Sequence, residues 1–153
     1  MSTPGSADHS GTGGGAARTS GLLVEIDHVA IAVHDLDAAI EYYRSVYGAE
    51  VVHREKVESD GVEEALIAVA QSYIQLVCPT RDDSPVAGFL ERRGEGLHHV
   101  GYRVEDCAVA LQAVRDAGGK LIDEAPRPGS RGTTVAFVHP KGAFGTLVEL
   151  VEE

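Results

Sequence analysis

The chain has 153 residues, an apolar fraction of 43% and a formal net charge of −11 at pH 7. That length suffices for one domain with a single buried core or for two small fused halves. The acidity argues against a nucleic-acid partner, which would require a basic face, and no apolar run approaches the ~20 residues of a membrane-spanning helix. The two cysteines, Cys78 and Cys107, form no disulfide framework or zinc-knuckle spacing, so the cytoplasm is the expected compartment.

The first 21 residues are mostly Ser, Thr, Gly and Ala. They offer too little apolar surface to offset the entropy of ordering, so a disordered tail is expected over residues 1–21. The tail also lacks the basic start and apolar centre of a secretory signal. A single folded domain is expected over residues 22–153.

The first half of this domain is predicted to form a strand, a helix and three further strands. Residues 24–33 place β-branched side chains at alternate positions, which indicates a strand. Asp35 can cap the helix that follows, and Gly48 ends it. The remaining strands are expected over 49–55, 64–70 and 73–78. Together these elements make a βαβββ module over residues 24–80.

The second half repeats this order after a short linking helix. That helix is expected over residues 84–93, because Ser84-Pro85 is a capping residue followed by proline at the first helical position. A second βαβββ module is expected over residues 96–151. Its elements are predicted over 97–104, 106–117, 120–124, 133–138 and 145–151. The Pro/Gly-rich loop over 124–132 is long enough to form part of a rim or lid.

The two modules also match residue by residue. At an offset of 71 residues, His28 falls on His99, and at an offset of 74 residues Gln75 falls on Glu149. A repeat of this length indicates a duplicated supersecondary unit. When two such units meet edge to edge, the two His and the two Gln/Glu side chains converge on one point.

This set of four side chains predicts a metal centre. Singly, each has a common structural alternative, a hydrogen-bonded strand histidine or a satisfied buried amide. Glu149, however, lies in a very apolar strand, and burying an unpaired carboxylate costs several kcal/mol. Two His with Gln and Glu suit a six-coordinate divalent ion such as Co²⁺, Mn²⁺ or Ni²⁺, and also admit Zn²⁺.

Two neighbouring positions bear on this site. His98 competes with His99, but it aligns with Asp27 in the repeat and is expected to point to the opposite face of the strand. Glu64 begins an apolar strand on the face shared by Leu66, so it is a candidate base that does not bind the metal. The alternative for Glu64 is an exposed charge at the strand end.

Four stretches of the chain resemble the methylmalonyl-CoA epimerase family of the vicinal-oxygen-chelate (glyoxalase/bleomycin-resistance) superfamily. The resemblance covers about residues 24–152. It rests on residues 26–30, 96–100, 139–142 and 147–150, supported by Gln75 and by the run Gly61-Val62-Glu63-Glu64. It implies an α+β fold of two βαβββ modules, with a metal site in the concavity of the sheet.

The resemblance also implies the reaction and the residues. The family interconverts (2R)- and (2S)-methylmalonyl-CoA by removing and returning the proton at C2 through an enolate. The matching metal ligands are His28, Gln75, His99 and Glu149, around one divalent ion per chain, with Co²⁺ the first choice. The matching catalytic residues are Glu64 and Glu149. Glu63 stands where family members tend to have an apolar residue, which leaves open which of Glu63 and Glu64 is the base.

Two other functions occur in the superfamily. One is a glyoxalase-type lactoylglutathione lyase, whose members of similar size more often have Glu at the position of Gln75. The other is a metal-free small-molecule-binding protein, which lacks the ligands. An acyl-CoA thioester is therefore the expected substrate. The loop cations Arg127, Arg131 and Lys141 are candidates to bind its nucleotide, and the alternative is that they are solvated surface charges. Superfamily members are commonly dimers, and open sheet edges favour a homodimer.

Removal of the tail gives a first test. A chain that begins at Gly21 is expected to keep its melting temperature and turnover, because residues 1–20 have too little apolar content to dock on a domain. Thermal unfolding of the two forms side by side measures this. A loss of more than a few degrees would show that the tail packs on the domain or bridges a dimer.

Overall fold

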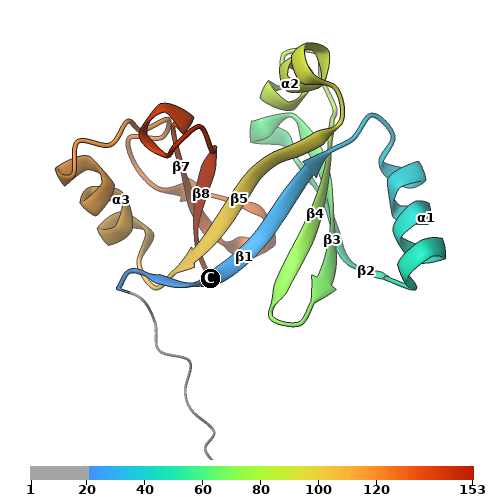
Figure 1. Ribbon diagram of the computed structural model, residues 1–153, viewed down its shortest axis with the longest axis horizontal. Coiled ribbons are helices and arrows are strands. Elements are labelled where there is room, and N and C mark those ends of the chain that lie inside the picture. The colour runs from blue at the N-terminus through green and yellow to red at the C-terminus, as the bar shows by residue number, and fades with distance from the viewer. Residues whose placement is uncertain (1–20) are drawn as a thin grey trace, which may run out of the picture.

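The computed structural model describes residues 21–153, in which the predicted order of elements occurs twice (Figure 1). The first module comprises β1 (Leu23–Ala32), α1 (Leu36–Tyr47), β2 (Val51–Val57), β3 (Val62–Val69) and β4 (Ser72–Pro79). After α2 (Pro85–Arg93), the second comprises β5 (Gly96–Val104), α3 (Cys107–Asp116), β6 (Arg127–Pro128), β7 (Thr134–Val138) and β8 (Val148–Glu152). The tail predicted over residues 1–21 lies outside the described residues, except for Gly21.

The helices of the two modules begin in the same way. Asp35 and Asp106 each accept a hydrogen bond from a backbone N–H three residues ahead, at 3.0 Å, as capping residues do. α1 ends at Gly48, whose φ of 64° lies in the left-handed region that glycine adopts without steric cost. Each helix within residues 21–153 falls short of the length and apolar character that crossing a membrane requires.

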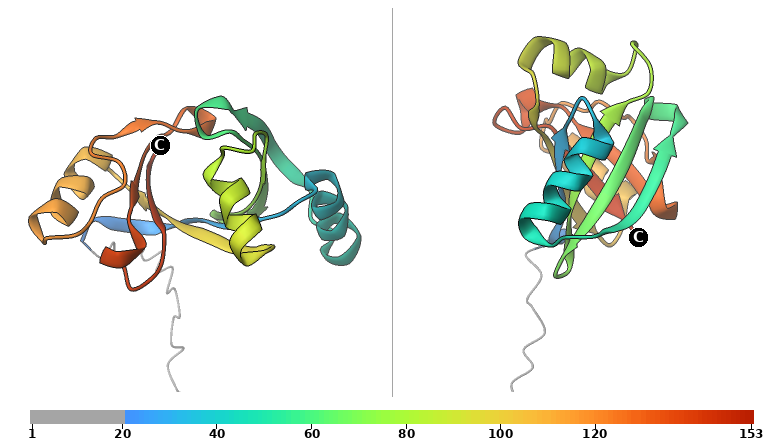
Figure 2. Two further views of the ribbon diagram at one scale, coloured as in Figure 1. Left: turned by 90° about the horizontal axis from the view of Figure 1, so that it is seen from above. Right: turned by 90° about the vertical axis from the view of Figure 1, so that its right-hand side faces the viewer.

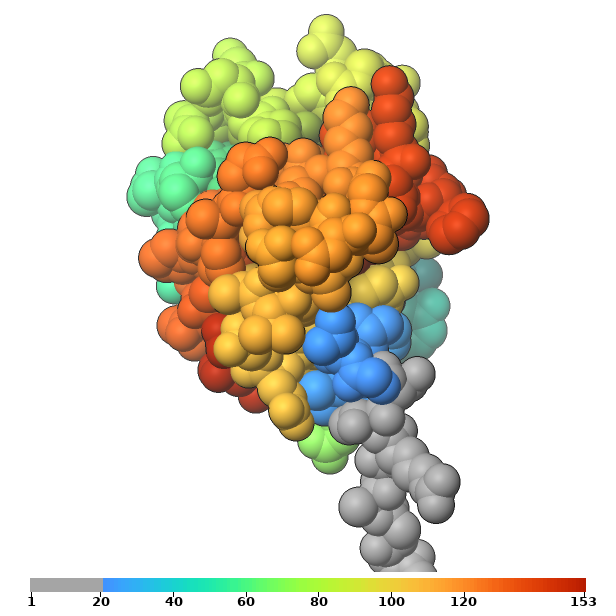
Figure 3. All heavy atoms as spheres, turned by 90° about the vertical axis from the view of Figure 1, so that its left-hand side faces the viewer, coloured from blue at the N-terminus to red at the C-terminus, as the bar shows by residue number. Residues whose placement is uncertain are grey.

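One mixed sheet joins the modules, in the strand order β2-β3-β4-β1-β5-β8-β7-β6. β1 and β5 pair antiparallel at its centre, while β4 runs parallel to β1 and β8 runs parallel to β5. The sheet curls into a half-barrel, with α1 and α3 at its two outer ends (Figure 2). Figure 3 shows the α3 end, where the start of β1 lies against the end of β5.

The helices α1 and α3 pack on the convex face of the sheet. Under α1, the first core includes Leu36, Ala65, Ile67 and Leu76. Under α3, the second core includes Cys107, Leu111, Ala136 and Leu150. Successive strand residues point to opposite faces, so the neighbours of these core residues point into the concave side of the sheet. Those neighbours include Glu64, Gln75 and Glu149.

The second module departs from the prediction at its outer strand. The strand expected over 120–124 is reduced to one bridge, between Leu121 and Val138. The Asp123 carboxylate accepts the backbone N–H of Phe137 at 2.8 Å, so a side chain takes the place of a backbone partner. The paired strand is instead β6, inside the stretch expected to be a loop.

Candidate metal centre

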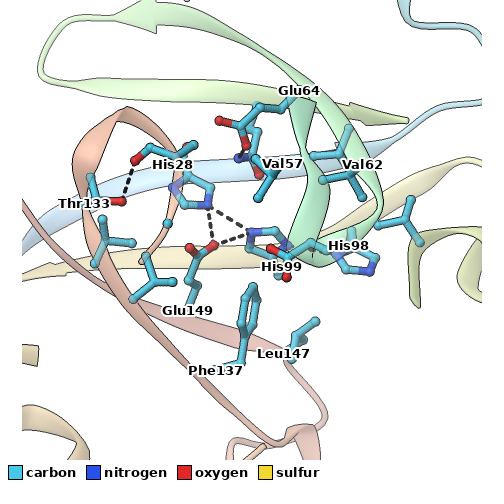
Figure 4. Close-up of a pocket in the computed structure, with 18 of the residues that line it drawn as sticks. His28, Val57, Val62, Glu64, His98, His99, Thr133, Phe137, Leu147 and Glu149 are labelled. Carbon is cyan, nitrogen blue, oxygen red and sulfur yellow. Dashed lines mark hydrogen bonds and ion pairs between the residues drawn. The ribbon is translucent and has the colours of Figure 1, made fainter. Parts of the chain in front are cut away.

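A cavity of about 910 Å³, including its open mouth, lies on the concave side of the sheet (Figure 4). Both modules contribute to its lining, so the cavity depends on their pairing through β1 and β5. Its polar lining includes His28, Glu64, Gln75, His98, His99 and Glu149. Its apolar walls include Val57, Val62, Val77, Phe137, Leu147 and Val151.

The strand register brings Gln75 and His99 to the same place. Ala30 of β1 pairs with Gln75 on one side and with His99 on the other. Residues opposite one another in adjacent strands project from the same face. Gln75 and His99 are therefore separated only by the methyl group of Ala30, which leaves space above the sheet.

Gly101 has the equivalent place in the other half of the site. It pairs with His28 of β1 and with Glu149 of β8. A Cβ atom on Gly101 would lie 2.3 Å from Cε1 of His28, closer than any side-chain contact allows. The residue must be glycine for the His28 imidazole to lie across β5 and approach Glu149.

Three donor atoms converge at the centre of this arrangement (Figure 4). His28 Nε2 lies 2.9 Å from His99 Nε2. Glu149 Oε2 lies 3.2 Å from the first nitrogen and 2.9 Å from the second. Lone pairs held this close repel unless a proton or a cation lies among them. The spacing suits neighbouring donors around one divalent ion with bonds of ~2.1 Å, and the donor set fits such an ion.

The charges of these groups reflect their crowding. Burial disfavours the charged form of His28, but hydrogen bonds to Asp27 and Glu149 outweigh burial and raise its pKa to about 9. Burial opposes ionisation of Glu149 as well, yet the hydrogen bond from His28 and the closeness of both histidine rings lower its pKa. A proton on His28 therefore balances the carboxylate, and a metal ion binding here must displace it.

Gln75 and Glu64 lie beside the three donors and are joined to each other. Gln75 Nε2 donates to Glu64 Oε2 at 2.5 Å. Among the described residues, the amide oxygen Oε1 of Gln75 and the second carboxylate oxygen Oε1 of Glu64 are buried without a hydrogen-bond partner. Burial raises the pKa of the Glu64 carboxyl. Two unsatisfied oxygens facing a cavity need a ligand, so Gln75 as fourth metal ligand stays a prediction that this geometry favours.

The predicted register of Glu63 and Glu64 is confirmed. Glu64 is buried and lines the cavity, whereas Glu63 lies on the other face of β3 and forms an ion pair with Arg54 at 2.7 Å. The alternative of an exposed strand-end charge does not apply to Glu64, because the residue is only 3% exposed.

The prediction that His98 points away from the site is wrong. A β-bulge in β5 places His98 between the pairs Ala30–His99 and Ile31–Leu97, so it has no opposite residue in β1. The bulge breaks the strict alternation of faces, and His98 lines the cavity with Nδ1 2.8 Å from His99 Nδ1. Burial and the neighbouring His99 lower the pKa of His98 to about 4, so its ring is neutral.

The sequence pattern does not identify Asp27 as a residue of the site. Its carboxylate is fully buried and accepts a hydrogen bond from His28 Nδ1 at 2.7 Å. The sequence feature that could have identified Asp27 is its position inside an apolar strand, directly before the candidate ligand His28.

The three loop cations proposed for CoA occupy different settings. Arg127 lines the cavity and pairs with Asp60 at 3.1 Å. Arg131 also lines it and pairs with Asp27 at 3.1 Å. Lys141 lies in the 3₁₀ turn Pro140–Gly142, outside the cavity lining.

The chain is similar to known proteins over most of its length. A family model for the glyoxalase/bleomycin resistance protein/dioxygenase superfamily matches residues 27–137. The ethylmalonyl-CoA/methylmalonyl-CoA epimerase of Cereibacter sphaeroides is 40% identical over 84% of this chain and 98% of its own. A methylmalonyl-CoA epimerase variant of Streptomyces coelicolor in complex with 2-nitronate-propionyl-CoA is 42% identical, with a TM-score of 0.82 over 86% of this chain and 95% of that chain. The methylmalonyl-CoA epimerase of Mycobacterium tuberculosis is 40% identical, with a TM-score of 0.84 over 88% and 91%.

Gly101→Ala tests the close approach of His28 to β5. The added methyl group must displace the imidazole, which Asp27 holds from the other side, so metal content is expected to fall and stability to drop by ~1–3 kcal/mol. Elemental analysis after dialysis against Co²⁺ and thermal unfolding measure the two effects. Ala30→Gly, at the equivalent position beside His99, serves as the control and should retain the metal. A Gly101→Ala protein that keeps one ion per chain would contradict the steric argument.

Proposed function

The chain belongs to the methylmalonyl-CoA epimerase family of the glyoxalase/bleomycin resistance protein/dioxygenase superfamily, and we propose that it interconverts the (2R) and (2S) epimers of methylmalonyl-CoA. The observation that carries this proposal is the position of Glu64. Its unpaired, buried oxygen faces the cavity beside the converging donors of His28, His99 and Glu149. A base next to a cation site is what removal of a proton α to a carbonyl requires.

We propose that four side chains hold one divalent ion, with Co²⁺ as the first choice and Mn²⁺, Ni²⁺ and Zn²⁺ as alternatives. They are His28, Gln75, His99 and Glu149. The convergence of three donors and the unsatisfied Gln75 Oε1 support this set. When bound, the ion supplies positive charge that stabilises the enolate oxygen of the substrate.

Glu64 is proposed to move the C2 proton on one face of the substrate. The hydrogen bond from Gln75 fixes Oε2 and leaves Oε1 free toward the cavity. Burial among valine side chains raises its pKa, which brings a carboxylate closer to the pH at which it both accepts and releases a proton.

Inversion requires a second proton carrier on the opposite face. Glu149 is proposed for this role, since it and Glu64 lie on opposite sides of His28 (Figure 4). The proton that Glu64 removes is balanced by a solvent proton that reaches the same carbon from the other side, relayed by the free oxygen of Glu149 or by water. The apolar walls, including Phe137 and Leu147, keep bulk water from competing for the enolate.

A cytoplasmic homodimer completes the proposal. β2 and β6 are the two outer strands of the sheet, and outer strands carry backbone groups available for pairing. Cys78 and Cys107 are free thiols, as expected in a reducing compartment. Light scattering on the purified protein measures the mass directly, and a monomer at all concentrations would refute the dimer.

The metal assignment can be tested by single substitutions. His28→Ala and His99→Ala are each expected to abolish stoichiometric Co²⁺ and epimerase activity while leaving most of the fold intact, because each removes one donor from the same point. Elemental analysis, circular dichroism and an epimerase assay measure these properties. If both variants keep one ion per chain and full turnover, the ligand set is wrong.

Glu64→Gln separates proton transfer from metal binding. The change is isosteric and keeps an oxygen that can accept from Gln75, so metal content and substrate affinity should stay close to the wild type. Turnover should fall by a factor of ~10²–10⁴, the usual contribution of a positioned general base. Solvent deuterium should then enter one epimer far more slowly than the other.

Glu63→Gln is the matched control for this experiment. It lies one residue away on the other face of β3 and loses only its partly exposed ion pair with Arg54, so turnover should be nearly unchanged. If neither substitution slows deuterium exchange, Glu64 is not the base and the proton is moved by another group.

A further inference from the structure

We propose that Asp27 and His98 are a matched pair of positioning residues, each of which fixes the tautomer of the ligand histidine that follows it. The inference rests on the proposed metal site. It concerns how His28 and His99 come to present a lone pair, instead of a proton, at Nε2.

The Asp27 half of the pair is seen in the hydrogen bonds of its carboxylate. Asp27 Oδ2 lies 2.7 Å from His28 Nδ1. An ionised carboxylate can only accept, so the Nδ1 of His28 must carry the proton. The neutral ring then has its lone pair on Nε2, the atom that faces His99 and Glu149.

Two arginines hold Asp27 in this orientation. Arg103 donates to Asp27 Oδ1 from Nε at 3.0 Å and from Nη2 at 2.7 Å. Arg131 donates to Oδ2 from Nη2 at 3.1 Å. Asp27 is fully buried, and a buried carboxylate is tolerated only when paired and hydrogen-bonded in this way. It can therefore neither rotate away from His28 nor become a donor without losing those bonds.

The His98 half of the pair follows from the same logic. His98 Nδ1 and His99 Nδ1 lie 2.8 Å apart, so one donates and the other accepts. His99 Nε2 faces the nitrogen of His28 and the carboxylate of Glu149. If Nε2 is to bind a metal, His99 must carry its proton on Nδ1, and His98 must be the acceptor.

The duplication explains why the two partners occupy these positions. Asp27 and His98 are equivalent residues at the 71-residue offset, each directly before its ligand. In the first module the partner is an anion, and in the second it is a neutral ring that reaches His99 because of the bulge in β5. The ring of His98 packs edge-on against Phe89, with centroids 4.9 Å apart, which restrains its rotation.

Two substitutions at His98 test the second half of the pair. His98→Phe keeps an aromatic ring against Phe89 but removes the acceptor, whereas His98→Asn places an acceptor oxygen where Nδ1 was. Calorimetric titration of the metal-free proteins with Co²⁺ should show binding ~10–100-fold weaker for His98→Phe, the usual loss on removing an outer partner of a ligand. His98→Asn should remain within about threefold of the wild type. Equal binding by all three proteins would overturn this assignment.

The tautomer can be read directly and without metal. Nitrogen-15 chemical shifts of the histidine rings in the metal-free wild type should place the proton of His99 on Nδ1, and in His98→Phe part of it should move to Nε2. A wild-type His99 protonated only on Nε2 would overturn the inference. If the wild type binds no Co²⁺ at all, the proposed metal site fails instead, so the two failures are distinguishable.

Asp27→Asn tests the first half of the pair. Arg103 will retain the amide oxygen, so the NH₂ group should face His28 Nδ1 and drive its proton to Nε2, weakening Co²⁺ binding at least as much as His98→Phe does. Co²⁺ binding by a folded Asp27→Asn protein as tight as the wild type's would refute this half. If the variant does not fold, the Zn²⁺-loaded wild type decides by nitrogen-15 spectroscopy: a proton on His28 Nδ1 is expected, and its absence would refute the assignment.

Discussion

The site is built around the close approach of three atoms: the Nε2 nitrogens of His28 and His99 and one carboxylate oxygen of Glu149. All three lie within 3.2 Å of one another. In water such groups would separate, because their lone pairs repel. Here they are held together by strands on both sides and by partners behind each histidine. The sheet supplies the positions, and Asp27 and His98 supply the orientation. Because folding has already ordered the three donor atoms, a cation that binds them does not have to bear the entropic cost of ordering them, as in other preorganised sites.

The duplication provides this convergence with few special residues. β1 and β5 lie antiparallel at the centre, so their equivalent histidines are placed next to each other. β4 and β8 then add Gln75 and Glu149 from the flanks. Ala30 lies between Gln75 and His99, and Gly101 lies between His28 and Glu149. Only Gly101 must be small, because the ring of His28 lies across it.

The sequence predicts the fold and the convergence of His28, His99 and Glu149 well, because both depend on periodic patterns. Strand alternation, capping residues and the repeat offset are all local or additive signals, and they place Glu64 and Glu63 on the correct faces. The position of His98 could not be predicted in this way. A bulge adds one residue to one strand only, and nothing in the alternation of β5 marks it. The same holds for residues 120–124, where the Asp123 side chain replaces a backbone partner.

The loop cations illustrate a related limit. The sequence gives Arg127 and Arg131 equal standing as basic residues near a site for a polyanionic substrate, but the structure gives each an acidic partner. Arg131 is held more firmly by other residues than Arg127 is. Its guanidinium pairs with the buried Asp27 and stacks on Tyr73, with its central carbon 4.8 Å from the centre of the ring. Its backbone N–H also donates to Glu55 of β2 at 3.1 Å, which ties the cavity rim to the opposite edge of the sheet.

The positive charge of Arg131 therefore stabilises the fold by neutralising the buried Asp27, whether or not a substrate is bound. Removing its charge would leave Asp27 with Arg103 and His28 alone, and a buried carboxylate that loses one cationic partner is strongly destabilised. Any attraction that Arg131 exerts on a CoA phosphate must compete with this pairing. In a protein with a net charge of −11, the cations that receive a polyanion must be ones whose acidic partners can be exchanged. Arg127 is the better placed of the two, because its pairs with Asp60 and Asp123 are partly exposed and so bind it less tightly.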